Sequence, residues 1–233
     1  LLLDGKAPMP GELMKLPELA STLSAIAEGG AEAFYKGPMA AKVADFVQGL
    51  GGWLTAEDMA NHSADWVDAI STDYRGVTCW QCPPNNQGVN VLMALNLAEG
   101  FDLAGTGFQE SETFHHMIEC VRLAMTDGMH FVTDPSKISM ETSKLISKAY
   151  ADERRSLIHR NAAIANLEVG DPNIKSDTVY ITAVDSDGNA CSLINSVYSN
   201  FGTGLVVPGT GMALQSRGAS FTLDTDHANV LEP

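Results

Sequence analysis

Two hydroxyl residues, Thr178 and Ser196, have a spacing that could bring them together on neighbouring strands. Both lie in β-prone stretches, over residues 178–184 and 190–197, and Asp187-Gly188 between them is a strong hairpin signal. A two-residue turn places position 178 opposite 197, and a loop one residue longer places it opposite 196. Either register brings Ser196 alongside Thr178.

Such a pair has two interpretations. It is a plain cross-strand Thr–Ser contact, or it is a nucleophile with the group that orients it. The sequence has no G-x-S-x-G elbow, no phosphate-binding G-x-x-x-x-G-K-[ST] loop and no H-E-x-x-H helix. The hairpin is therefore the most specific chemical signal in the chain.

Metal and redox chemistry are weakly signalled. Cys79 and Cys82 form a C-x-x-C, but residues three apart on a strand point to opposite faces, and no second pair completes four ligands. His116 and Glu119 are one helical turn apart without an evident third ligand. We predict structural thiols, no metal and no cofactor.

Composition excludes several classes of partner. The 233 residues are 45% hydrophobic and 18% charged, which is typical of a globular chain. The net charge of −15 repels phosphate backbones and anionic lipid, so we expect neither nucleic acid nor membrane as a partner. No apolar run approaches the roughly 20 residues that a membrane span needs. The Leu-Leu-Leu start is not read as a signal peptide, and the compartment stays open between cytoplasm and periplasm or exterior.

The predicted elements place helices first and the ribbon last. Thr55 and Asp58 resemble a capping box at the start of a short helix. Gly29-Gly30 is expected to end the first helix. This order favours an α+β fold. Helical patterns cover residues 17–28, 38–49, 89–99, 111–127 and 141–155, and two short strands are expected within 66–82.

Six blocks carry a family resemblance in the right order, nearly end to end. They are GGAEAFYKGPMAAKVADFVQGLGGWLTAEDM, DYRG, PPNNQGVNVLMALNLAEGFDL, FHHMIECVRLAMTDGMHFVTDP, DTVYITAVDSDGNA and FGTGLVVPGTGMALQSRGASF. With these blocks the chain resembles the gamma-glutamyltranspeptidase family of N-terminal nucleophile hydrolases. The resemblance implies a four-layer αββα sandwich, of which this chain would be a portion.

The resemblance also implies a catalytic threonine at Thr178. In the family the precursor cuts itself before this residue, so the hydroxyl of Thr178 would attack the Asp177 carbonyl. Residues 1–177 would then end the large subunit and residues 178–233 begin the small one. The freed amine, with a pKa near 8, can act as general base. Ser196 matches a hydroxyl that holds the threonine.

Three positions depart from the family where it binds the glutamyl donor. An asparagine is replaced by Tyr198, a glutamine by Arg217 and an aspartate by Ser220. The aspartate is the natural anion for a substrate ammonium, and arginine suits a carboxylate. The pocket is therefore expected to favour an anionic or uncharged acyl group, unless Arg217 is merely a surface charge. The short segment after Phe221 resembles the acylase-like and amidohydrolase-like branch.

The sequence thus predicts an autoprocessing threonine hydrolase or acyltransferase acting on an amide. The family name implies glutathione or another γ-glutamyl donor. The alternatives are a cephalosporin-type, glutaryl or oxamate-like amide, or a non-catalytic unprocessed relative. The expected partners are this small molecule and the two subunits of one precursor, with a homodimer left open. The family extends before residue 1 and beyond Pro233, where its oxyanion hole lies, so this stretch alone is expected to be inactive.

Overall fold

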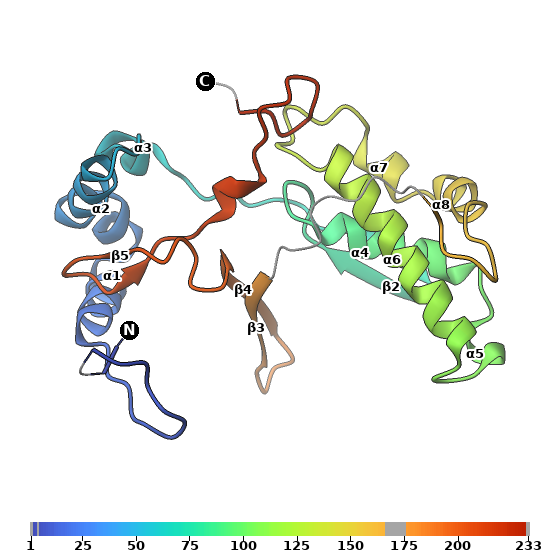
Figure 1. The fold of residues 1–233 in the computed structure, drawn as a ribbon, viewed down its shortest axis with the longest axis horizontal. Coiled ribbons are helices and arrows are strands. Elements are labelled where there is room, and N and C mark those ends of the chain that lie inside the picture. Colours follow the sequence, from blue (N-terminus) through green and yellow to red (C-terminus); the bar gives the residue numbers. More distant parts are fainter. Residues whose placement is uncertain (1, 4, 166–175, 232–233) are drawn as a thin grey trace. The chain divides into compact units, whose positions relative to one another are not determined.

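The protein is described by a computed structural model over residues 2, 3, 5–165 and 176–231, and it divides into two compact units (Figure 1). The first unit joins Leu1–Ala64 to Ile174–Gly218, and the second joins Asp65–Asn173 to Ala219–Pro233. Helices and short antiparallel strands occur in both, in agreement with the α+β prediction. Each unit holds residues from both sides of position 178, and this division does not test where the chain would be cut.

The first helix, α1, spans Pro17–Tyr35 and is kinked at Gly30. Gly30 has φ 62° and ψ −155°, a backbone conformation that glycine adopts without a steric penalty. The sequence predicts that the helix ends at Gly29-Gly30. The chain instead leaves the helical conformation for this one residue and continues as helix to Tyr35.

Two further helices follow where the sequence predicts them. Helix α2 spans Pro38–Gly49, and α3 spans Ala56–Asn61. The capping box is confirmed: the Thr55 backbone N–H donates to Asp58 Oδ2 at 2.7 Å, and the Asp58 N–H donates to Thr55 Oγ1 at 3.1 Å. The hydrogen bond from the Thr55 hydroxyl to Asp58 Oδ2, at 2.7 Å, is the main reason why the pKa of Asp58 is lowered, and the bond from the Thr55 N–H adds to it.

Helices of the first unit pack against its late strands, β5 (Val206–Val207) and β6 (Met212–Ala213). Thr22 of α1 donates to the carbonyl of Thr210 at 2.8 Å, and this bond is buried. The segment after the hairpin is thereby fixed on the helical part of the unit. The small apolar core consists of Ala40, Val43, Met59 and Val207, with Phe34, Tyr35, Phe46, Met212 and Leu214 packed against it.

The second unit contains a two-stranded hairpin and most of the remaining helices. Its largest core lies between α4 and α6 and includes Val89, Leu123 and Leu145. Arg75 and Gly76 form the hairpin turn, both with positive φ, as a two-residue turn with left-handed residues requires. The elements are β1 (Ile70–Tyr74), β2 (Val77–Gln81), α4 (Gly88–Glu99), α5 (Leu103–Thr106), α6 (Ser111–Phe131), α7 (Thr142–Leu145) and α8 (Lys148–Arg155).

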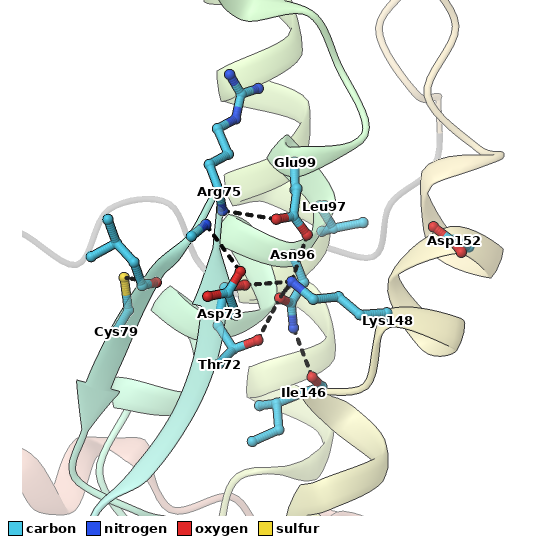
Figure 2. A network of polar contacts seen from close by, with 12 residues as sticks. Thr72, Asp73, Arg75, Cys79, Asn96, Leu97, Glu99, Ile146, Lys148 and Asp152 are labelled. Atoms are coloured by element: carbon cyan, nitrogen blue, oxygen red, sulfur yellow. Dashed lines mark hydrogen bonds and ion pairs between the residues drawn. The ribbon is translucent and has the colours of Figure 1, made fainter.

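A polar network ties the strands of this unit to its helices (Figure 2). Lys148 Nζ donates to the Asp73 carbonyl at 2.5 Å, to Asn96 Oδ1 at 2.7 Å and to Glu99 Oε2 at 2.6 Å. Thr72 Oγ1 also donates to Asn96 Oδ1, at 2.7 Å. The hydrogen bond from Lys148 is the main reason why the pKa of Glu99 is lowered. All three ammonium donors of Lys148 therefore have protein acceptors.

Other charged side chains of the second unit are also paired. Arg154 binds both carboxylate oxygens of Asp127, at 2.9 and 2.6 Å, and Tyr150 donates to the same carboxylate at 3.0 Å. Burial, followed by the Asp127 charge, raises the pKa of Tyr150 to about 12. The buried Glu119 pairs with Arg122 at 2.5 Å. These groups stabilise the unit by satisfying one another.

Candidate active site

The hairpin that carries Thr178 is formed by β3 (Ser176–Val184) and β4 (Ala190–Ser199). The Asp185 N–H donates to the Asn189 carbonyl at 3.0 Å, which encloses a three-residue loop ending at Gly188 with φ 84°. The longer loop predicted as one option is therefore present, and the two-residue turn is wrong. A type I turn followed by a left-handed glycine is the usual form of this loop.

The Asp185 side chain fixes this loop length. Its Oδ1 accepts from the N–H groups of Asp187 at 3.0 Å and Asn189 at 2.8 Å, and its Oδ2 accepts from the Asn189 amide at 2.9 Å. The bond from the Asn189 side chain is the largest cause of the lowered pKa of Asp185. An aspartate that holds the backbone two and four residues on favours the longer loop over a two-residue turn.

This register places Thr178 directly opposite Ser196. Thr178 Oγ1 donates to Ser196 Oγ at 3.1 Å, and the backbone N–H of Tyr198 donates to the same oxygen at 2.9 Å. Ser196 Oγ thus holds the Thr178 hydroxyl from one side while its own position is fixed by the strand. Thr178 and Ser196 therefore lie side by side, as the sequence predicts. This geometry fits both a plain cross-strand contact and a nucleophile with the group that orients it.

The strand pairing is irregular at the residue before Thr178. Ser176 pairs with Ser199, whereas Thr178 pairs with Ser196, so two residues of β4 lie opposite Asp177 alone. This is a β-bulge, a feature that often re-aims a side chain next to an active site. One of the two bulged residues, Tyr198, has φ 77°, which is unusual for a residue other than glycine. The side chain of Asp177 lies outside the described residues.

Arg217 comes to the bulge from a later segment. Its guanidinium carbon lies 5.2 Å from the centroid of the Tyr198 ring, within the range of a cation–π contact. The next residue back, Ser216, donates its N–H to the Val197 carbonyl at 3.0 Å and accepts the Ser199 N–H on its hydroxyl at 3.3 Å. These bonds attach the segment to β4 on both sides of Tyr198.

A close backbone approach explains one glycine of the FGTG block. Gly202 has φ 59°, and a Cβ at this position would lie 2.2 Å from the carbonyl oxygen of Leu214. The same carbonyl accepts the Thr203 N–H at 2.9 Å. Only glycine combines this backbone conformation with this separation, so the block is needed to bring the Arg217 segment onto β4.

Ser220, the third substrate residue predicted, is exposed and ends the 3₁₀ turn Arg217–Ser220. It falls in the second unit, and its position relative to Thr178 is not described. Sequence reasoning identified Tyr198 and Arg217 separately but missed their contact. It also missed Ser216, for which the sequence offers no signal beyond its place beside Arg217.

The other residues considered for chemistry include two cysteines and a histidine. Cys79 and Cys82 are free thiols. His116 is buried and stacks on Phe101 with ring centroids 4.1 Å apart, and burial lowers its pKa. Across the described residues, no grouping of three or more His, Cys, Asp or Glu side chains could hold a metal ion. In the same part of the chain, no helix has both the length and the apolar character of a membrane span.

Comparison with known proteins adds independent information. The family model described as gamma-glutamyltranspeptidase matches residues 1–233. The chain is 37% identical over 229 residues to a glutathione hydrolase-like proenzyme (YwrD) of Bacillus subtilis, covering 98% of the chain and 43% of the relative. It is 31% identical over 232 residues to an oxamate amidohydrolase proenzyme of Klebsiella pneumoniae, covering 100% and 43%.

The fold is also similar to a solved structure. A cephalosporin acylase from Bacillus halodurans superposes with a TM-score of 0.84 at 42% identity, over 99% of this chain and 41% of that one. The chain therefore spans less than half the length of the relatives it matches. The three names refer to different substrates: glutathione, oxamate and a cephalosporin.

Proposed function

The chain belongs to the gamma-glutamyltranspeptidase family, and from this premise we propose that the whole protein is an amide hydrolase or acyltransferase whose nucleophile is Thr178. The observation that carries the proposal is the bond from Thr178 Oγ1 to Ser196 Oγ at 3.1 Å, at the start of β3. Because the chain spans 43% of the length of the Bacillus subtilis relative, the activity is proposed for the complete polypeptide.

The first step of the proposal is self-cleavage. Thr178 Oγ attacks the carbonyl carbon of Asp177, the C–N bond breaks, and the proton of the hydroxyl passes to the Thr178 nitrogen, which becomes an amine. Water then hydrolyses the resulting ester, leaving an Asp177 carboxylate and a free Thr178 hydroxyl. The subunits would be separated between residues 177 and 178. The bulge opposite Asp177 supports this site, because irregular pairing leaves the backbone there less constrained.

The second step uses the new N-terminus. The Thr178 amine, with an ordinary pKa near 8, takes the hydroxyl proton as Oγ attacks the substrate carbonyl. The amine then returns this proton to the leaving nitrogen, and an ester forms on Thr178. Water, or a second amine in a transfer reaction, attacks the ester and restores the hydroxyl. Ser196 orients Thr178 through its hydroxyl and takes no proton.

We also propose the four-layer αββα sandwich for the complete protein. Both faces of the β3–β4 hairpin expose large apolar side chains, and a strand that is apolar on both faces is typical of the middle of a layered fold. Apolar side chains of this size are normally buried by neighbouring elements of a fold. The large apolar side chains that the hairpin exposes are Val179, Tyr180, Ile181, Val184, Leu193 and Ile194, with exposed fractions of 52–71%.

The acyl group has two candidate classes. Glutathione or another γ-glutamyl donor is supported by the family and by the name of the Bacillus subtilis relative. A non-glutamyl acyl group is supported by Arg217 beside Tyr198, and by relatives named as a cephalosporin acylase and an oxamate amidohydrolase. We favour the second class, because Arg217 repels the α-ammonium that a γ-glutamyl group carries.

Trapping the acyl-enzyme tests the proposed function. The complete protein is incubated with an acyl p-nitroanilide, quenched in acid and digested, and the modified peptide is sequenced by mass spectrometry. We expect one acyl group on Thr178. Thr182→Ala is the matched control, because Thr182 lies on the same strand opposite another serine, Ser192, and should leave the adduct in place. An adduct on another residue would remove Thr178 from the mechanism.

A further inference from the structure

Arg217 differs from every other arginine of the chain. There are six arginines, and the side chains of five donate hydrogen bonds to protein oxygens: Arg75, Arg122, Arg154, Arg155 and Arg160. The guanidinium of Arg217 instead lies over the Tyr198 ring, and within the described residues no carboxylate forms an ion pair with it. In a chain with 29 acidic and 14 basic residues, this is an unusual state for an arginine.

Among the described residues, none accepts a hydrogen bond from the Arg217 guanidinium, which contacts the Tyr198 ring. A guanidinium that stacks on a ring presents its N–H groups in its own plane, toward the sides. These donors match the two oxygens of a carboxylate in a bidentate pair. The Arg217 side chain is exposed, so a ligand can reach it without displacing a protein group.

Tyr198 holds its ring in place through an unusual backbone. Its φ of 77° lies in the left-handed region, which residues other than glycine rarely adopt. The bulge and the bond from the Tyr198 N–H to Ser196 Oγ maintain this conformation. This conformation thus lies where the ring meets Arg217, two residues from the serine that holds Thr178.

The Arg217 backbone is fixed as well. Its N–H donates to the side-chain oxygen of Gln215, and Ser216 is attached to β4 by two hydrogen bonds. Both the cation and the ring beneath it are therefore held by β4, the strand that also supplies Ser196. The hydrogen bond from the Tyr198 N–H to Ser196 Oγ links the two residues directly.

We propose that Tyr198 is a positioning residue that holds Arg217 as a receptor for a carboxylate at the far end of the acyl group. The inference rests on the proposed function of Thr178. The favoured substrates are amides of short dicarboxylic acids that lack an α-ammonium group. Ser196 links the two sites, because it accepts the Thr178 hydroxyl and the Tyr198 N–H on one oxygen.

Three anilides separate the parts of this proposal. Glutaryl p-nitroanilide has the distal carboxylate, pentanoyl p-nitroanilide lacks it, and γ-glutamyl p-nitroanilide adds the α-ammonium. The complete protein should have the highest kcat/KM for the glutaryl compound. Arg217→Gln should lower kcat/KM for that compound roughly 10- to 100-fold, the usual effect of removing a charged hydrogen-bond partner, and change the pentanoyl value less than about twofold.

Variants of Tyr198 test the positioning role. Tyr198→Asn removes the ring but tolerates the left-handed backbone, so folding should be retained. It should raise KM for the glutaryl anilide about fivefold, the scale of an exposed cation–π contact, and should affect KM for the pentanoyl anilide less. Tyr198→Phe keeps the ring face and should restore the wild-type KM.

The outcomes are distinguishable from failure of the proposed function. If the protein hydrolyses the glutaryl and pentanoyl anilides equally well, or if Arg217→Gln lowers both alike, the receptor does not exist, although Thr178 can still be the nucleophile. If Tyr198→Asn leaves the glutaryl KM unchanged, the positioning role is wrong. A protein that hydrolyses none of the three anilides and is not cut before Thr178 overturns both proposals.

Discussion

Lys148 and Arg154 of the second unit differ from Arg217 of the first unit in the groups that their side chains contact. In the second unit, Lys148 donates all three of its N–H groups to protein oxygens (Figure 2). Arg154 donates to both carboxylate oxygens of Asp127. In the first unit, Arg217 lies on an aromatic ring beside the Thr178 hairpin. A cation whose donors are all used stabilises the fold. One that pairs with no carboxylate among the described residues, as Arg217 does, is proposed to be available to a ligand. Substitutions should therefore change stability in one unit and substrate choice in the other.

The largest effect is expected at the nucleophile. Thr178→Ala should abolish both cleavage and turnover, lowering kcat by about 10⁴-fold or more, because one hydroxyl serves both steps. Thr178→Ser keeps a hydroxyl and should retain part of each activity. Gel analysis and anilide assays of the complete protein measure both. Continued splitting of the alanine variant would show that another residue cuts the chain.

A smaller effect is expected from restoring two residues that the family resemblance implies for binding of the glutamyl donor. Arg217→Gln combined with Ser220→Asp removes the cation and supplies an anion for an α-ammonium. The ratio of kcat/KM for γ-glutamyl over glutaryl anilide should rise about 100-fold, while the free energy of unfolding changes little. A wild-type ratio already well above one would contradict the account of substrate choice and leave Thr178 untouched.

In the second unit, a substitution is expected to change stability and to leave turnover unchanged. Lys148→Met should lower the free energy of unfolding by about 1–3 kcal/mol, because Asp73, Asn96 and Glu99 lose a shared donor. Turnover per folded molecule should not change. Lys144→Met is the control, since its ion pair is 3.9 Å long and exposed, and it should cost under about 0.5 kcal/mol. Equal urea midpoints for the two variants would refute the structural role of the network.

This network also predicts a pH dependence. The pKa of Glu99 is below its ordinary value of 4.5 in the folded protein, mainly because Lys148 donates to it. The folded state therefore gains stability from Glu99 above pH 4.5 and loses it as the pH falls through the lowered pKa. Lys148→Met should reduce the loss between neutral and acidic pH. An unchanged pH profile of unfolding would show that Glu99 gains little from Lys148.

The smallest catalytic effect is expected at Ser196. Ser196→Ala should lower kcat about tenfold, equivalent to about 1.4 kcal/mol, because the Thr178 hydroxyl loses its orienting partner. The stability change should stay within about 1 kcal/mol, as for a cross-strand pair. Ser192→Ala removes a hydroxyl from the same strand and should leave kcat unchanged. Equal rates for the two variants would return Ser196 to a structural role.

Local signals in the sequence were sufficient for much of the fold. The limits of α2, the capping box at Thr55 and the presence of the Thr178 hairpin follow from prolines, glycines and short polar patterns. The hairpin register was left between two options, because the loop depends on how Asp185 binds the backbone two and four residues later. Helix α1 leaves the helical conformation at Gly30, where the glycines predict an end, but it resumes and reaches Tyr35, where Phe34 and Tyr35 pack against the core of the first unit.

The candidate site was predicted less completely. Thr178 and Ser196 follow from the register and the family blocks, but the Tyr198–Arg217 contact joins residues 19 positions apart through a bulge and a tertiary tether. Neither the bulge nor the hydrogen bonds that attach the Arg217 segment to β4 produce a periodic pattern in the sequence. The left-handed conformation of Tyr198 could not be foreseen, because tyrosine has no preference for it.

The identity of the new N-terminus tests the central claim most directly. The complete protein is purified without added protease, and its intact masses and N-terminal sequences are determined. The account predicts two fragments, the smaller beginning Thr178-Val179-Tyr180, and loss of both anilide hydrolysis and this fragment in Thr178→Ala. An uncut chain that hydrolyses acyl anilides, or a cut at any other bond, would contradict the assignment of Thr178 as the nucleophile.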